Sequence, residues 1–291
     1  MTDGARPSAL PSPAVIDTLV LSHANGFPLP VYRRLFDALG PAFAGTGLLR
    51  FGHDPTRPVT VGWPYLVDEL VEFVNALPRT DGRLWLAGHS LGGYLSVLAA
   101  ERLGARVAGI VLLDSPVISG LSAAAVRLGR RTGLDRLMMP LDATLQRRRH
   151  WPDVAAAHAH YAAKAAFARW DPRVLRDYVE HCTVPDGRGQ RELLFDRDVE
   201  FRIYRSLPTG RVAEIGARLR APIAFIGGRQ SRELRLVGLR ATRALVGSRL
   251  YWAAGSHLFP MEAPEDTAGL IRTAIDAMRD AGESDSTRAI R

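Results

Sequence analysis

Two amino acids are almost missing from this chain. Cys182 is the only cysteine among the 291 residues, which excludes a disulfide bond within the chain and fits a reducing compartment. Lys164 is the only lysine, so nearly all of the positive charge is carried by arginine. The formal net charge is +8, but the arginines are scattered and no basic run is interleaved with aromatic residues. We therefore expect no nucleic-acid partner.

Long apolar segments are missing too. No apolar run approaches the roughly 20 residues that a membrane-spanning helix requires. The residues up to Pro13 are rich in proline, serine and alanine, and they lack the apolar core of a secretory signal. From these observations we expect no membrane span, a cytoplasmic location and a disordered segment over residues 1–14.

The most informative stretch of the chain covers residues 84–103. Its apolar start predicts a buried strand, and leucines near helical spacing predict a helix after it. Between the two, Ser90 is flanked by Gly88 and Gly92. A strand that turns sharply into a helix would hold Ser90 at strained backbone angles and expose its hydroxyl, while a Cβ at either glycine would collide with neighbouring elements. We interpret this stretch as a nucleophile elbow.

Strands and helices alternate on both sides of the elbow. We predict strands at residues 18–21, 47–51, 84–87, 107–114, 222–228 and 249–252, and helices at 30–39, 65–77, 91–103, 232–245 and 264–278. This order predicts an α/β fold, with a mainly parallel central sheet covered by helices on both faces. With a hydrophobic fraction of 47%, the chain can bury a sizeable core as one large domain or a domain with an insertion.

The alternation stops between about residues 118 and 207. That segment is rich in arginine and alanine, with helical patterns near 123–129, 153–168 and 172–181. We expect it to form a helical cap or lid, inserted into a core made of residues 15–117 and 208–280. The polar tail, residues 281–291, is expected to be disordered.

Three short motifs follow three of the predicted strands. They are His23-Ala24-Asn25-Gly26-Phe27-Pro28, Gly88-His89-Ser90-Leu91-Gly92-Gly93 and Gly255-Ser256-His257. In this order the chain resembles the α/β-hydrolase superfamily, and the Gly-His-Ser-Leu-Gly-Gly motif is typical of its esterase and lipase branch. The resemblance covers about residues 15–280 and includes the inserted segment, which falls where these enzymes carry a cap.

The resemblance implies a serine hydrolase without a cofactor. Ser90 would be the nucleophile, and His257, in the loop after the last predicted strand, would be the base. The backbone N–H of Leu91 would supply one donor to the oxyanion, and the second would come from Asn25 or, by another alignment of the motif, from Phe27.

The acid of the catalytic triad is less clear from the sequence. In most relatives an aspartate follows the strand that here covers 222–228, but the matching position holds Gln230, which cannot carry a negative charge. Asp114 follows the strand next to the elbow, at an alternative acid position that some members of the fold use. We predict Asp114 as the acid, with Glu233 as its rival.

These residues predict cleavage of a small-molecule carboxylic ester, thioester or lactone through an acyl-enzyme. Two alternatives remain open: a carbon–carbon bond hydrolase that uses the same triad, and a binding protein of this fold without turnover. We expect no metal site, because His158 and His160 are two residues apart and diverge on a helix. The sequence leaves the oligomeric state and the substrate open.

Overall fold

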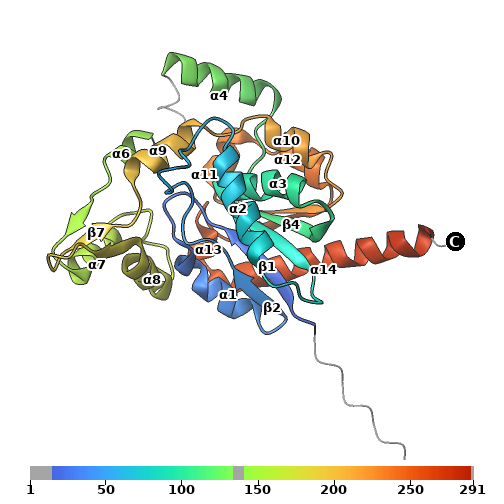
Figure 1. Cartoon of the computed structure of the whole chain (residues 1–291), viewed down its shortest axis with the longest axis horizontal. Coiled ribbons are helices and arrows are strands. Elements are labelled where there is room, and N and C mark those ends of the chain that lie inside the picture. Colours follow the sequence, from blue (N-terminus) through green and yellow to red (C-terminus); the bar gives the residue numbers. More distant parts are fainter. Residues whose placement is uncertain (1–14, 134–140, 290–291) are drawn as a thin grey trace, which may run out of the picture.

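A six-stranded parallel sheet forms the centre of the molecule (Figure 1). The computed structural model describes residues 15–133 and 141–289, with side chains up to residue 281. The strands lie in the order β2-β1-β3-β4-β8-β9, and every neighbouring pair is parallel. Their bounds are β1 (Asp17–Ser22), β2 (Phe43–Thr46), β3 (Leu84–His89), β4 (Val107–Leu113), β8 (Ile223–Gly228) and β9 (Leu250–Ala253). The predicted α/β architecture is confirmed.

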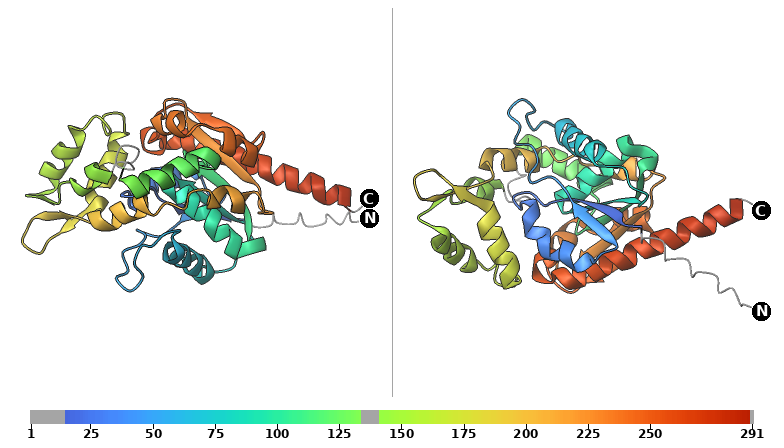
Figure 2. Two further views of the ribbon diagram at one scale, coloured as in Figure 1. Left: turned by 90° about the horizontal axis from the view of Figure 1, so that it is seen from above. Right: turned by 60° about the horizontal axis from the view of Figure 1, so that its bottom comes forward.

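Helices cover both faces of this sheet (Figure 2). One face packs against α1 (Arg33–Leu39) and α14 (Pro264–Ala289), and the other against α2 (Pro64–Ala76), α3 (Leu91–Leu103), α10 (Arg211–Gly216) and α12 (Arg240–Val246). In β3, Leu84 and Leu86 belong to one buried apolar cluster, whereas Trp85 and Ala87 belong to the other. Because successive side chains point to opposite faces, an interior strand must be apolar at every position.

The segment between β4 and β8 lies largely beside the sheet (Figure 1). It contains α4 (Gly120–Thr132), α6 (Leu141–Leu145), α7 (Val154–Ala162), α8 (Pro172–Cys182) and α9 (Arg197–Arg205). It also contains a small antiparallel sheet in the order β5-β7-β6, made of β5 (His150–Trp151), β6 (Thr183–Pro185) and β7 (Arg191–Leu193). We did not predict this sheet, because strands of two or three residues show no alternating pattern.

Two predicted elements differ from the structure. The strand expected at 47–51 is β2 at Phe43–Thr46, and the apolar residues that follow form a loop in which Phe51 is buried against His23, with ring centroids 4.9 Å apart. The helix expected at 232–245 is divided into α11 (Arg232–Val237) and α12, because Gly238 between them has a φ of +76°. In both places the spacing of apolar residues determined neither the backbone conformation nor the burial of every residue, since Leu49 and Leu236 are exposed.

The remaining elements are short, apart from the end of the chain. They are η1 (Leu29–Tyr32), η2 (Gly104–Arg106) and α13 (Phe259–Glu262). The prediction of a disordered tail from residue 281 was wrong as far as 289, because α14 continues to Ala289. Residues 1–14, for which we predicted disorder, are outside the part of the chain that the structure describes. Among the helices that the structure describes, none is long and apolar enough to cross a membrane.

Candidate active site

Ser90 lies in a sharp turn between β3 and α3. Its φ of 55° and ψ of −120° are strained for a residue with a side chain. A Cβ at Gly88 would lie 2.3 Å from the carbonyl oxygen of Gly92, and a Cβ at Gly92 would lie 2.0 Å from the carbonyl oxygen of Ser22. Only glycine fits at these two positions. The spacing of the motif therefore has the steric cause that the sequence indicated.

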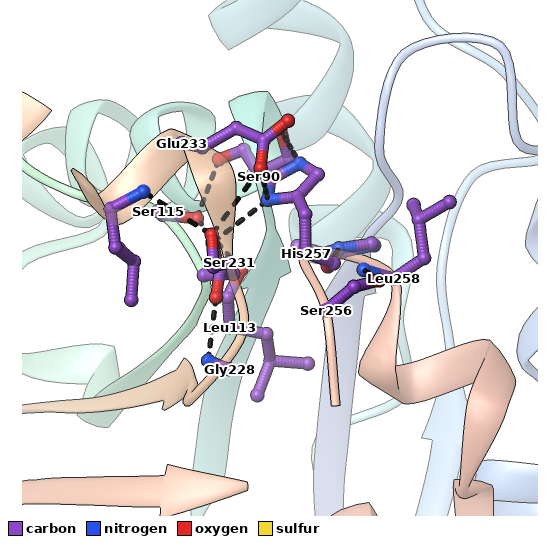
Figure 3. Close-up of polar contacts among 12 residues, drawn as sticks. Ser90, Leu113, Ser115, Gly228, Ser231, Glu233, Ser256, His257 and Leu258 are labelled. Atoms are coloured by element: carbon purple, nitrogen blue, oxygen red, sulfur yellow. Dashed lines mark hydrogen bonds and ion pairs between the residues drawn. The ribbon is translucent and has the colours of Figure 1, made fainter. Parts of the chain in front are cut away.

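His257 lies beside Ser90 (Figure 3), and two hydrogen bonds of its ring join Ser90 to Asp114. Its Nε2 lies 3.0 Å from Ser90 Oγ, and its Nδ1 lies 2.8 Å from Asp114 Oδ1. A carboxylate accepts hydrogen bonds, so in the neutral ring Nδ1 carries the proton and Nε2 accepts from the Ser90 hydroxyl. The structure thus brings together the three residues that we singled out after the strands β3, β4 and β9.

The Asp114 carboxylate is fully buried and fully hydrogen-bonded. Oδ2 accepts from the backbone N–H of Gly228 at 2.7 Å, and Oδ1 accepts from Ser231 Oγ at 2.7 Å. Asp114 has a φ of 43°, which is uncommon for a non-glycine residue. These contacts compensate the burial of its charge and aim the carboxylate at His257.

Glu233 lies near the same imidazole but more loosely. Its Oε2 is 3.9 Å from His257 Nδ1, and its side chain is 46% exposed. The same Oε2 lies 3.3 Å from Ser231 Oγ, whose proton makes the shorter hydrogen bond to Asp114. Gln230, at the position where the family resemblance led us to look for an acid, accepts a hydrogen bond from Arg169 in the segment between β4 and β8. Asp114 therefore makes the shorter and better enclosed contact, and Glu233 lies beside it.

The same three groups form the one cluster of potential metal ligands among the described residues. Ligand atoms of Asp114, Glu233 and His257 lie within 4.8 Å of one another. However, Nδ1 of His257 donates its proton to Asp114, and a nitrogen that carries a proton has no lone pair for a cation. The cluster fits hydrogen bonding better than metal binding.

Opposing influences set the pKa of His257. Burial lowers it, but the hydrogen bond to Asp114 and the negative charges of Asp114 and Glu233 outweigh burial, so the pKa lies above the usual 6.5. Two other histidines beside the elbow behave differently. Burial lowers the pKa of His23 to about 4 and that of His89 to about 3, so both stay neutral.

The sequence predicted the backbone N–H groups of Leu91 and of Asn25 or Phe27 as donors to the oxyanion. Within the part of the chain that the structure describes, the N–H groups of Leu91 and Asn25 have no hydrogen-bond partner. Leu91 is the first residue of α3, where N–H groups have no acceptor inside the helix. The N–H of Phe27 is occupied, since it donates to the carbonyl of Ala24 at 3.1 Å. Of the two alternatives from the sequence, Asn25 has the available donor.

A cavity of about 500 Å³ opens next to Ser90 and His257. The core and the segment between β4 and β8 both contribute to its walls. Most of its lining is apolar, and those residues are Leu91, Tyr94, Pro116, Ile118, Ala125, Val126, Tyr204, Leu207, Leu236 and Val237. A mostly apolar cavity of this size suits a small-molecule substrate.

Sequence reasoning missed several residues that support this site. Ser231, which binds both Asp114 and Glu233, has no motif around it. Arg147 and Glu200 form a buried ion pair beside Gly26, but 53 residues separate them in the sequence. His89 contacts the His257 carbonyl, and its position directly before Ser90 was the one feature in the sequence that could have indicated such a role. The others depend on contacts between distant segments, which spacing cannot report.

Comparisons with known proteins agree with the fold. The model of the Alpha/beta hydrolase family matches residues 19–270. A comparison with curated protein sequences found no match. Similar solved structures include E-2-(acetamidomethylene)succinate hydrolase, which has 20% identity and a TM-score of 0.67 over 90% of this chain and 91% of that one.

Two further structures are similar to this chain. The thioesterase domain from the curacin biosynthetic pathway has 18% identity and a TM-score of 0.67, over 90% of this chain and 92% of that one. An esterase from Mycobacterium tuberculosis has 18% identity and a TM-score of 0.64, over 91% of this chain and 86% of that one. At such identities these likenesses concern the fold. Since the family model covers most of its length, the chain belongs to the alpha/beta hydrolase family.

Proposed function

We propose that this protein is a serine hydrolase that cleaves a carboxylic ester, or a related thioester or lactone, through an acyl-enzyme on Ser90. The observation that carries the proposal is the unbroken chain from Ser90 Oγ to His257 Nε2, at 3.0 Å, and from His257 Nδ1 to Asp114 Oδ1, at 2.8 Å. All three of these residues line the 500 Å³ cavity. A nucleophile, a base and an acid to orient the base are the parts that acyl transfer requires.

In the proposed acylation step, Ser90 Oγ attacks the acyl carbon while its proton passes to His257 Nε2. The resulting imidazolium is stabilised by Asp114, which stays ionised. His257 then gives the proton to the departing alcohol or thiol, and the acyl group remains on Ser90. In the second half, water attacks the acyl carbon with His257 again as base, which releases the acid and restores Ser90.

The oxyanion that forms in each half would be held by the N–H groups of Leu91 and Asn25. Both are free to donate within the described residues. Each such donor contributes about 3 to 4 kcal/mol to transition-state stabilisation in enzymes of this chemistry. No cofactor is needed, because the side chains and backbone supply the nucleophile, the proton transfers and the charge stabilisation.

We also propose that residues 118–207 act as a cap that selects the substrate. Ile118, Ala125 and Val126 come from the start of this segment and Tyr204 and Leu207 from its end, and all line the cavity. The similar structures include a thioesterase domain and an esterase, which is consistent with acyl-bond cleavage. The apolar walls favour a small or medium acyl ester over a charged substrate.

Two measurements test the function. The first is turnover of p-nitrophenyl esters of increasing acyl length by the wild-type protein, with Ser90→Ala and His257→Ala as inactive controls. The second is labelling by a fluorophosphonate probe, located by mass spectrometry. We expect ester turnover that both substitutions abolish, and label on Ser90 alone.

Other outcomes would favour the alternatives. Folded wild-type protein that takes no label on Ser90 would indicate a binding protein of this fold. Label on Ser90 with turnover of a diketone and of no ester would indicate a carbon–carbon bond hydrolase.

A further inference from the structure

Three hydrogen bonds in series link the loop that carries Asn25, the residue before Ser90 and the loop that carries His257. The backbone N–H of Ala24 donates to Tyr32 Oη at 3.0 Å, Tyr32 Oη lies 2.8 Å from His89 Nδ1, and His89 Nε2 lies 2.9 Å from the carbonyl oxygen of His257. Ala24 precedes Asn25, and His89 precedes Ser90. The chain ends on the proposed base itself.

The direction of each hydrogen bond follows from its partners. The His257 carbonyl can only accept, so His89 Nε2 carries a proton and donates it. The neutral ring then accepts at Nδ1, which requires the Tyr32 hydroxyl to donate there while its oxygen accepts from Ala24. The chain therefore has one possible proton arrangement, with every group satisfied.

Neither Tyr32 nor His89 is available for proton transfer. Tyr32 is 1% exposed and His89 is fully buried. Burial lowers the pKa of His89 to about 3 and raises that of Tyr32 well above its usual range. Both stay neutral at the pH at which His257 must gain and lose a proton, so their contribution is geometric.

We infer that His89 and Tyr32 are positioning residues for acyl transfer, because they fix the backbone of His257 relative to Ser90 and to the loop that carries Asn25. His257 lies in a loop, and loops are held less firmly than strands. His89, the last residue of β3, anchors that loop to the central sheet. Small displacements of a catalytic group are costly to rate, so the loss of this anchor should affect turnover more than substrate binding. This inference rests on the proposed function.

Three substitutions test the inference with a p-nitrophenyl ester that the wild-type protein hydrolyses. Tyr32→Phe removes the middle of the chain, His89→Met removes both nitrogens, and His89→Gln keeps a donor that can reach the His257 carbonyl. We expect the first two to lower kcat by about 10- to 100-fold, with KM within about threefold of wild type. His89→Gln should recover most of kcat.

The pH profile and additivity separate positioning from general destabilisation. A His257 that is less well aligned with Asp114 has a lower pKa, so the acid limb of kcat/KM should move to lower pH in Tyr32→Phe and His89→Met. The double variant should lose little more kcat than His89→Met alone, because both substitutions break the same chain.

Trp85→Phe is the matched control. Trp85 lies near the start of β3, at the opposite end from His89, and its substitution removes a buried 2.6 Å hydrogen bond to Asp17 of β1. It should lower Tm and leave kcat unchanged.

The inference is overturned if folded Tyr32→Phe and His89→Met keep kcat within twofold of wild type, or if Trp85→Phe loses as much kcat as they do. If His89→Met does not fold, Tyr32→Phe and His89→Gln carry the same comparison. Failure of the proposed function looks different, because the wild-type protein itself would then neither turn over the ester nor take label on Ser90.

Discussion

The side-chain amide of Asn25 donates to the backbone carbonyl of Glu200 at 2.9 Å, and so ties the loop after β1 to α9 of the inserted segment. The next residue, Gly26, has a φ of +82° and lies against the buried pair of Glu200 and Arg147. The loop that carries a proposed oxyanion donor is thus held from the core by Tyr32 and from the inserted segment by Glu200.

We predict that Gly26→Ala lowers kcat by about 10- to 100-fold, through displacement of the Asn25 donor. An added Cβ would lie 2.1 Å from Glu200 Oε1 and 2.8 Å from Arg147 Nη1, so this ion pair or the loop that carries Asn25 must shift. Gly187→Ala is the control: its φ is +75°, and nothing lies within 4 Å of the added Cβ.

Both alanines incur the backbone cost of the left-handed conformation, about 1 kcal/mol. Only Gly26→Ala should affect kcat. Urea unfolding measures the stability of both variants, and ester hydrolysis measures kcat. Equal kcat in the two variants would contradict a role of this contact in turnover.

The second prediction separates the two carboxylates beside His257. Asp114→Asn should lower kcat by roughly 10³- to 10⁴-fold, because the asparagine amide favours the wrong tautomer of the imidazole. Glu233→Gln should change kcat by less than about threefold, since this half-exposed group lies 3.9 Å from Nδ1 and the charge is screened by water. Steady-state kinetics of both folded variants, with circular dichroism as the check on folding, give the ranking. A larger loss in Glu233→Gln would reassign the acid.

A third prediction concerns pH. The base must be neutral to accept the Ser90 proton, so kcat/KM should fall as pH falls through the pKa of His257. Because Asp114 and Glu233 raise this pKa, the midpoint of the acid limb should lie above 6.5. Glu233→Gln removes one negative charge, so its midpoint should move to lower pH while the plateau changes little. A pH profile of kcat/KM in buffers of constant ionic strength tests both statements. An unchanged midpoint in Glu233→Gln would show that the charge of Glu233 does not affect the pKa of His257.

Sequence reasoning reached the fold and placed the proposed nucleophile because local constraints fix both. The glycines around Ser90 exclude a side chain for steric reasons, and the apolar residues of β3 and β4 fill both faces of the sheet. Such constraints fix the residue type at each position, so a pattern records them even where the contact is distant in the sequence, as it is for Gly92 and Ser22.

The supports of the site depend instead on contacts between distant segments. Ser231 reaches Asp114 across 117 residues, and Asn25 reaches Glu200 across 175. No spacing rule records such contacts. The misplaced second strand has a related cause. Phe51 lies in a loop and is buried against the ring of His23, so its apolar side chain does not indicate strand pairing.

The last prediction tests the proposed cap through two adjacent alanines of α4. Ala125 lines the cavity beside Ser90, whereas Ala124 lines a separate groove that includes neither Ser90 nor His257. Ala125→Phe places a ring in the acyl space and should lower kcat/KM for long-chain p-nitrophenyl esters at least tenfold more than for the acetate, since each apolar group excluded from a pocket costs about 1 to 3 kcal/mol. Ala124→Phe, with the same change in volume one residue away, should leave the chain-length profile as it is in the wild type. If the two variants give the same profile, α4 does not contact the acyl chain, and the substrate must lie against the core side of the cavity, near Tyr94 and Val237.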